Sequence, residues 1–125
     1  MGAEQDNREV EAKPVATRKA PKTLPLFPVA RVSEIPPGKM IGTDVSGDRI
    51  LVANVRGEFY AMRAKCNHMG GALDKGTLEN NVVTCPLHGS KWDVKTGALV
   101  QFVRPLPPET VYRVLVEGDQ ISVEK

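Results

Sequence analysis

The sequence predicts an all-β, antiparallel domain. Short runs rich in Val, Ile and other strand-forming residues alternate with turn-forming pairs, and no segment carries the 3.6-residue apolar period of a long amphipathic helix. Each run has ordinary strand length and is far too short to cross a bilayer. The predicted strands are Val29–Val32, Ile50–Val55, Glu58–Met62, Val82–Thr84, Val111–Val116 and Ile121–Val123.

Pairs of turn-forming residues separate these runs. Gly and Asn adopt the positive φ angles that two-residue hairpin loops require, so consecutive strands should be joined as hairpins. We also expect one helical turn around Ser33–Pro36. The predicted turn pairs are Gly47-Asp48, Arg56-Gly57, Asn80-Asn81 and Gly118-Asp119.

The N-terminal segment differs in composition from the rest of the chain. Residues 1–24 are rich in Ala, Pro, Lys and Glu and nearly lack large apolar side chains, so they cannot bury enough surface to offset chain entropy. We expect a disordered tail at 1–24, with a tether to a partner as its alternative role, and one folded domain at 25–125.

Composition and charge exclude several classes of function. The chain has 125 residues and a net charge of +2, without a basic block or a ladder of aromatic residues, which argues against a nucleic-acid partner. The N-terminus has neither an apolar signal core nor a twin-arginine pair, so we expect a cytoplasmic protein without membrane contact. A processed form that has lost a signal is the alternative.

The soft metal ligands are confined to two short clusters. The two cysteines and two histidines of the chain form Cys66-Asn-His68 and Cys85-Pro-Leu-His88. Thiolate and imidazole together select zinc or an iron–sulfur centre. Structural zinc sites usually pair like ligands within each cluster, whereas mixed clusters suit two irons that divide the cysteines and histidines between them. The alternatives are a structural zinc site in an interaction module and two unrelated thiols.

These clusters and their flanking residues closely resemble the signature of the Rieske 2Fe-2S family. The resemblance extends over roughly Phe27–Val123. It implies two cluster-binding loops that form a small subdomain on an antiparallel sandwich or barrel-like base. The flanking residues that carry it are Gly70-Gly71-Ala72-Leu73, Gly89-Ser90-Lys91-Trp92-Asp93 and the closing Val116–Ile121 hairpin.

The resemblance also implies a ligand set for one 2Fe-2S cluster per chain. Cys66 and Cys85 would hold the buried iron, and His68 and His88 the outer iron that changes valence. The Pro-containing segment Arg104–Pro108 resembles the loop that covers the cluster in this family, with a plain connector as the alternative.

Five further residues are candidates for tuning the cluster. Gly70, Gly71 and Gly89 permit close backbone approach, and their N–H groups would stabilise the reduced form; the alternative is ordinary turn glycine. Ser90 is a hydrogen-bond donor to the cluster or a turn-stabilising hydroxyl. Trp92 is interpreted as packing that shields the second loop from water.

The chain departs from the high-potential branch of the family in two ways: it lacks the bracing disulfide, which indicates a reducing compartment, and it lacks the phenolic hydrogen-bond donor to the cluster. That branch braces its loops with a disulfide, whose cysteines would fall at Gly71 and Leu87 here, and it places a Tyr where this chain has Trp92. A chain without disulfides, with both cysteines committed to metal, fits a reducing compartment.

The leading functional hypothesis is a one-electron carrier rather than an enzyme. The resemblance implies a Rieske-type ferredoxin that passes electrons from a flavin-dependent reductase to a terminal oxygenase or other redox enzyme, through transient contact at the His68/His88 face. The alternative from another class is a small redox subunit of a larger enzyme, such as a nitrite reductase. A complete Rieske oxygenase is excluded, because both histidines are already assigned and none is left for a catalytic iron.

Overall fold

The computed structural model describes residues 25–66 and 70–125 of the chain. The predicted tail at 1–24 lies outside the described residues, so the domain boundary stays a prediction. The short segment 67–69 with His68 lies outside them as well. Within the described part, the secondary structure consists of strands and two single 3-10 turns, and no helix is long and apolar enough to cross a bilayer.

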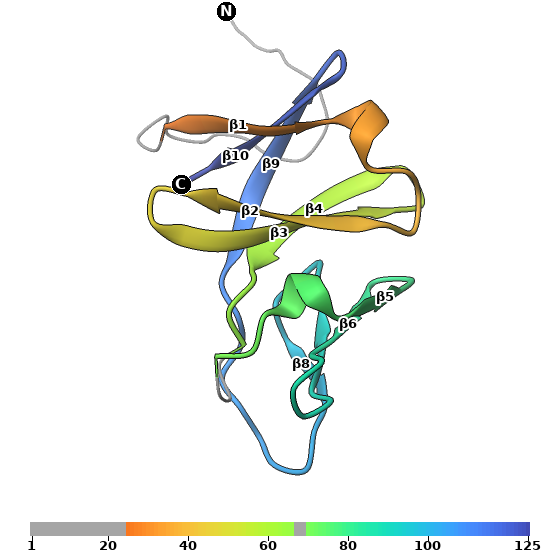
Figure 1. Cartoon of the computed structure of the whole chain (residues 1–125), viewed down its shortest axis with the longest axis vertical. Helices are drawn as coiled ribbons and strands as arrows, with labels where there is room; N and C mark the ends of the chain where they lie inside the picture. Colours follow the sequence, from red (N-terminus) through yellow and green to blue (C-terminus); the bar gives the residue numbers. More distant parts are fainter. Residues whose placement is uncertain (1–24, 67–69) are drawn as a thin grey trace, which may run out of the picture.

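The strands form two antiparallel sheets, which confirms the predicted fold class (Figure 1). Their bounds are β1 Leu26–Arg31, β2 Met40–Val45, β3 Asp48–Val55, β4 Glu58–Arg63, β5 Thr77–Glu79, β6 Val82–Thr84, β7 Lys91–Asp93, β8 Leu99–Gln101, β9 Val111–Glu117 and β10 Gln120–Glu124, and the 3-10 turns are η1 Val32–Glu34 and η2 Leu73–Lys75. The larger sheet has the order β1-β10-β9-β4-β3-β2, and the smaller β5-β6-β7-β8. The smaller sheet lies at one end of the molecule, beyond the larger one.

The larger sheet curls around its own hydrophobic core, which we call the base core. Its buried side chains come from β2, β3, β4, β10 and the segment after η1, and residues of β1 and β9 pack against them. Strands from both edges of the sheet therefore cover the same core, as in a barrel-like base. The buried members are Ile35, Val45, Ile50, Val52, Ala61, Ile121 and Val123.

A second core, the shared core, lies between the two sheets and reaches the metal loops. It combines side chains of β3 and β4 with side chains of the smaller sheet and both cysteines. The loops thus rest on the same packed interior that holds the base together. The buried members are Leu51, Ala53, Val55, Met62, Ala64, Cys66, Leu73, Val83, Cys85, Trp92 and Val94.

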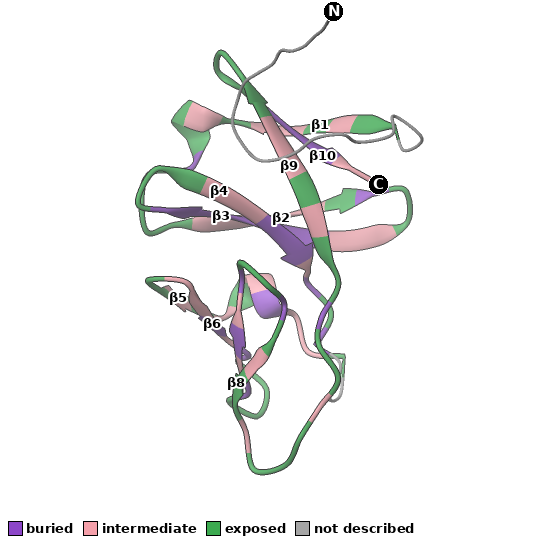
Figure 2. Ribbon diagram, turned by 180° about the vertical axis from the view of Figure 1, so that it is seen from behind, coloured by how far each residue is buried: buried purple, intermediate pink, exposed green. Residues whose placement is uncertain are grey.

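Strand β3 separates the two cores. Successive side chains of a strand point to opposite faces, so Ile50 and Val52 enter the base core while Leu51, Ala53 and Val55 enter the shared core. The strand is accordingly buried over most of its length (Figure 2). This explains why it reads in the sequence as a continuous apolar run rather than an alternating one.

The predicted hairpin turns form, with one shift in position. Ser46-Gly47 and Arg56-Gly57 all have positive φ, as two-residue hairpin loops require, and Asn80 and Gly118 also have positive φ. The first loop is Ser46-Gly47 rather than Gly47-Asp48, because Asp48 is already paired with Val45 as the first residue of β3. The expected helical turn forms as η1, one residue earlier than predicted.

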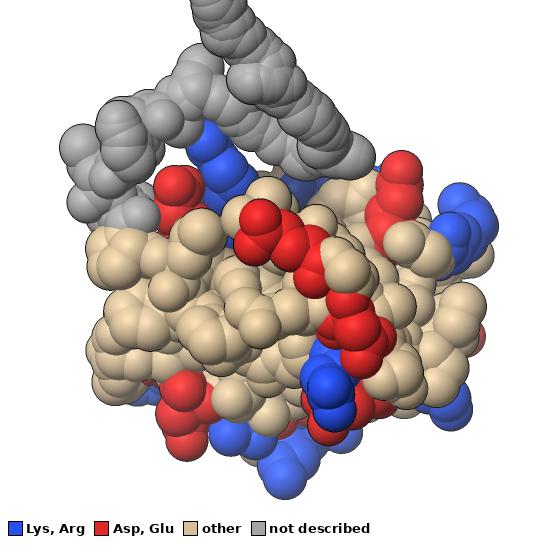
Figure 3. Space-filling model, turned by 90° about the horizontal axis from the view of Figure 1, so that it is seen from above, with Lys and Arg blue, Asp and Glu red and all other residues tan. Residues whose placement is uncertain are grey.

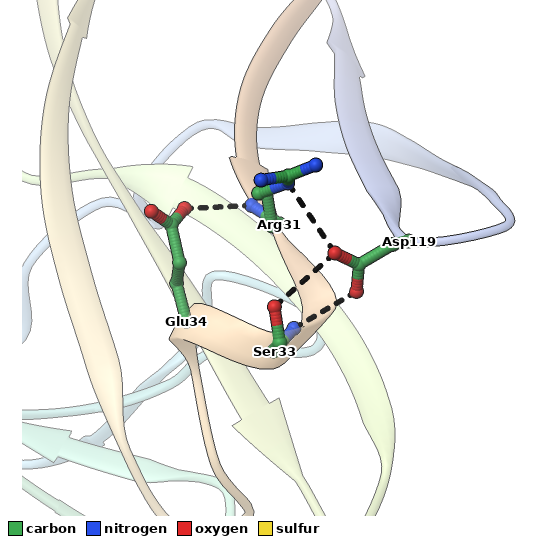
Figure 4. A network of polar contacts seen from close by, with 4 residues as sticks. All are labelled: Arg31, Ser33, Glu34 and Asp119. Carbon is green, nitrogen blue, oxygen red and sulfur yellow. Dashed lines mark hydrogen bonds and ion pairs between the residues drawn. The ribbon is translucent and has the colours of Figure 1, made fainter.

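Polar contacts fix the end of the base that lies away from the smaller sheet (Figure 4). Asp119, in the β9–β10 turn, accepts hydrogen bonds from the backbone N–H and the hydroxyl of Ser33, both at 3.1 Å, and pairs with Arg31 at 3.3 Å. Glu34 accepts the Arg31 backbone N–H at 2.8 Å. Seen from this end, acidic and basic side chains lie interspersed among uncharged ones (Figure 3).

A partly buried ion pair links the larger sheet to η2. Asp74 of η2 is only 3% exposed at its side chain, and its Oδ2 lies 3.0 Å from Nη2 of Arg49 on β3. This hydrogen bond and the charge of Asp74 raise the pKa of Arg49. The other carboxylate oxygen of Asp74 is buried without a hydrogen-bond partner among the described residues, so Arg49 is the main compensation for a buried charge.

We predict that Arg49→Met lowers the melting temperature of the holoprotein, because the Asp74 carboxylate would stay buried without its partner charge. The matched control is Asp44→Asn. Asp44 pairs with the same arginine at 3.6 Å but is 74% exposed, so its loss should change the unfolding free energy by less than about 0.5 kcal/mol. Calorimetry yielding equal effects for the two variants would contradict this assignment.

Candidate metal centre

The two metal loops share one backbone pattern, shifted by 19 residues along the chain. The N–H of Cys66 donates to the carbonyl of Gly71, and the N–H of Cys85 donates to the carbonyl of Ser90, both at 2.8 Å. In return, Gly70 donates to the Cys66 carbonyl at 2.9 Å and Gly89 to the Cys85 carbonyl at 3.0 Å. The described residues of two separate sequence segments therefore share the same hydrogen bonds around a cysteine.

The loops are closed at their base in the same way. The residue before each cysteine pairs antiparallel with the residue that follows the loop, Lys65 with Ala72 and Thr84 with Lys91. Gly70 and Gly89 have φ angles of 73° and 80°, a conformation that side chains other than glycine rarely adopt. The N–H groups of Gly70 and Gly89 donate to the carbonyl oxygens of Cys66 and Cys85. Donation from Gly70, Gly71 and Gly89 to the cluster stays a prediction.

Each loop also contacts the sulfur of the other. The Ser90 hydroxyl of the second loop lies 3.4 Å from Sγ of Cys66 in the first. A methyl group placed on Gly71 of the first loop would lie 2.8 Å from Sγ of Cys85 in the second, closer than real side chains approach. Gly71 and Ser90 occupy equivalent positions, five residues after each cysteine, so the contact is reciprocal.

The sulfur side of the centre is buried and the histidine side is open. Cys66 and Cys85 are 3% and 2% exposed, and neither takes part in a disulfide. His88, by contrast, is exposed and borders an open groove of about 470 Å³ together with Phe102, Val103 and Arg104. A group held by these loops would have its cysteine end in the shared core and its histidine end toward the surface.

The candidate tuning residues Ser90 and Trp92 lie inside the shared core region, and both are fully buried. The indole N–H of Trp92 donates to Oγ of Ser90 at 3.0 Å. Trp92 therefore packs as interpreted from the sequence, and it also makes a directed polar contact that the sequence did not indicate.

Two apolar residues near His88 were missed by sequence reasoning. Val103 is 91% exposed and Leu87 is 52% exposed. Leu87 precedes His88 in the chain, and Val103 lines the same groove as His88. The sequence signal was an apolar pair, Phe102-Val103, directly before the Pro-containing segment Arg104–Pro108 that was assigned as the covering loop. Leu106 of that segment packs against the shared core.

No three Cys, His, Asp or Glu side chains of residues 25–66 and 70–125 gather closely enough to hold a single ion. His68, the fourth sequence-predicted ligand, lies outside these ranges. The described members of the predicted set are thus Cys66 and Cys85 inside the loops and His88 at the surface.

Comparison with known proteins decides the family. A model of the Rieske [2Fe-2S] domain matches residues 26–120, which is most of the chain and includes both loops. The chain belongs to the Rieske family. This confirms the resemblance inferred from the loops, and it replaces the zinc alternative with a 2Fe-2S cluster as the cofactor.

Curated Rieske relatives are similar over nearly their full length. The ferredoxin component of biphenyl 2,3-dioxygenase from Rhodococcus jostii is 36% identical over 101 residues, which cover 81% of this chain and 94% of that protein. The biphenyl dioxygenase ferredoxin subunit of a Pseudomonas species is 35% identical, covering 74% of this chain and 85% of the subunit.

Solved structures extend the similarity to three dimensions. The ferredoxin of carbazole 1,9a-dioxygenase from Nocardioides aromaticivorans is 33% identical with a TM-score of 0.72, covering 78% of this chain and 96% of that one. A chain from the complex of reduced oxygenase and oxidized ferredoxin in carbazole 1,9a-dioxygenase is 29% identical with a TM-score of 0.75, covering 79% and 92%.

The described residues fit the cluster that the Rieske family carries. Two buried sulfurs outside any disulfide supply soft ligands, and the Ser90 hydroxyl lies beside one of them. Gly71 leaves room for the Cys85 sulfur where any side chain would intrude. The donor set and the space around it therefore suit a thiolate-bound iron.

We predict that Gly71→Ala lowers the iron and sulfide content of the purified protein severalfold. The added methyl group would lie 2.8 Å from the Cys85 sulfur and 3.1 Å from Cβ of Leu87, so the two loops would have to separate. The control is Gly118→Asn in the β9–β10 turn, where φ is 59° and no atom lies within 4 Å of an added Cβ. Full cluster loading of Gly71→Ala would show that the loops do not need this close approach.

Proposed function

We propose that this protein is a one-electron carrier that receives electrons from a flavin-dependent reductase and delivers them to a terminal oxygenase. The observation that carries the proposal is the one-sided opening of the site, with buried cysteines and an exposed His88 beside an apolar groove. The relatives support it, because they are ferredoxin components of dioxygenases, and one solved relative is in a complex of oxygenase and ferredoxin. The same relatives favour a separate carrier over a nitrite reductase subunit.

The proposed ligand set is Cys66 and Cys85 for one iron and His68 and His88 for the other. When bound, the cluster supplies reversible one-electron transfer, at a higher potential than an all-cysteine cluster because two neutral imidazoles replace two thiolates. The cysteines sit in the water-excluded shared core, and His88 extends the site to the surface. The chain's own part is to shield the sulfur end and to expose the histidine end.

The groove beside His88 is the proposed docking surface for both partners. Leu87 and Val103 are exposed apolar side chains, and Arg104 adds a positive charge at the groove. A small apolar patch with a charge at its edge suits short-lived complexes, because it gives specificity and fast encounter without a large buried area. A carrier that meets two partners in turn needs such an interface.

We place the protein in the cytoplasm. Both cysteines of the chain belong to the proposed ligand set, so no thiol is left for a bracing disulfide. Cysteines that must stay out of disulfides to bind metal suit a compartment that keeps thiols reduced.

We expect His88→Ala and His88→Cys to remove the visible absorption and the electron paramagnetic resonance signal typical of a Rieske centre. The outer iron would lose a neutral nitrogen donor, which distinguishes this cluster from an all-thiolate one. Spectra of the purified, dithionite-reduced variants test this, with Lys95→Gln as a surface control. An unchanged spectrum in either variant would exclude His88 from the ligand set.

We expect Val103→Asp to slow electron transfer to the oxygenase component of a biphenyl dioxygenase by about tenfold, because a charge would be desolvated in the apolar patch, equivalent to about 1.4 kcal/mol. Stopped-flow oxidation of the reduced protein measures the rate. Val116→Asp is the control, since Val116 is also exposed, at 44%, but lies on β9 near the far turn. Equal rates for Val103→Asp and wild type would show that the docking surface does not include Val103.

A further inference from the structure

Three buried groups form a continuous chain from Trp92 to the Cys66 sulfur. The indole Nε1 of Trp92 lies 3.0 Å from Oγ of Ser90, and the same oxygen lies 3.4 Å from Sγ of Cys66. Trp92 and Ser90 are fully buried and Cys66 is 3% exposed. Water therefore has little access to any of these groups.

The chemistry of the groups fixes the direction of both hydrogen bonds. An indole N–H can only donate, so Ser90 is the acceptor in its contact with Trp92. A cysteine that ligates metal has lost its proton and can only accept, so the Ser90 hydroxyl must donate to Cys66. The chain thus runs from Trp92 through Ser90 to the ligand sulfur.

The first bond strengthens the second. A hydroxyl that accepts a hydrogen bond becomes a better donor, and this polarisation is largest where the surroundings exclude water. The indole also restricts the rotation of the Ser90 hydroxyl, because an oxygen held by Trp92 on one side presents its proton on the other. Trp92 therefore both orients and polarises the donor.

One-electron reduction increases the negative charge on the ligand sulfurs. A donor that points at such a sulfur binds the reduced state more strongly than the oxidised state, and so raises the reduction potential. An indole in van der Waals packing alone would have no such preference between redox states.

We propose that Trp92 is a positioning residue that raises the reduction potential by holding and polarising the Ser90 hydroxyl that donates to the Cys66 sulfur. This inference rests on the proposed ligation of the cluster by Cys66. It extends the sequence-based interpretation of Trp92, which assigned the residue to packing.

The test is a double-mutant cycle in reduction potential, measured by spectroelectrochemical titration of the holoproteins. Ser90→Ala should shift the one-electron equilibrium toward the oxidised form about tenfold, or about 59 mV, and Trp92→Phe about threefold, or about 28 mV. Trp92→Phe keeps an aromatic ring but removes the N–H donor. Because Trp92 acts through Ser90, Trp92→Phe should cause no further shift in the Ser90→Ala background.

Additive shifts in the cycle would overturn the proposal, because a cavity left by the smaller ring would act independently of Ser90. An unchanged potential in Trp92→Phe would overturn it as well. Failure of the proposed function gives a different result, since a wild-type protein that shows no Rieske resonance signal on reduction lacks the cluster altogether.

A second measurement uses only the wild-type protein, so it does not depend on whether a variant binds the cluster. Trp92 is the one tryptophan of the chain, so ultraviolet resonance Raman bands of indole report on this residue alone. In the wild-type holoprotein, the band sensitive to indole N–H bonding should indicate a stronger bond after reduction by dithionite, because the Ser90 proton is drawn further toward sulfur. Identical bands in the two redox states would overturn the proposal.

Discussion

The reciprocal contact between the two metal loops is the constraint on which the rest of the site depends. Each loop closes on its own cysteine through the same pair of backbone hydrogen bonds, and each places its fifth following residue against the other loop's sulfur. The residue at Gly71 must be small for this, and Ser90 adds a polar contact to the Cys66 sulfur. Because the loops define each other's geometry, neither could form the sulfur end of the site alone.

The shared core transmits that constraint to the base of the protein. Cys66 and Cys85 lie in this core together with Leu51 and Met62 from the larger sheet. Strand β3 contributes to both cores, and the Arg49–Asp74 pair links it to η2 beyond the first loop. The sulfur side of the metal site thus lies in a buried core, while the histidine side opens to a groove. A buried sulfur side and an exposed histidine side suit an electron carrier, because water is excluded from the sulfurs while one face stays accessible to partner proteins.

The sequence predicted much of this arrangement, and its limits have physical reasons. The all-β class followed from β-branched runs and turn pairs, and the family followed from two mixed Cys/His clusters. Strands β2, β5, β7 and β8 were missed. Strand β2 contains Gly42 and Asp44, and the other three lack the run of β-branched residues that marks the equally short β6. The Trp92–Ser90 bond joins residues whose spacing is common in any strand, so only the fold could show that the Ser90 hydroxyl contacts both the Trp92 indole and the Cys66 sulfur. His68 lies outside the described residues, and its role stays a prediction.

The midpoint potential of the purified wild-type protein tests the central claim most directly. The proposed set of two histidine ligands and one buried hydroxyl donor, without a bracing disulfide, predicts a single one-electron transition per chain at about −150 to +50 mV. A transition near about −400 mV, where clusters with four cysteine ligands of the plant type lie, would contradict the mixed ligation. A protein without any transition would contradict its assignment as an electron carrier.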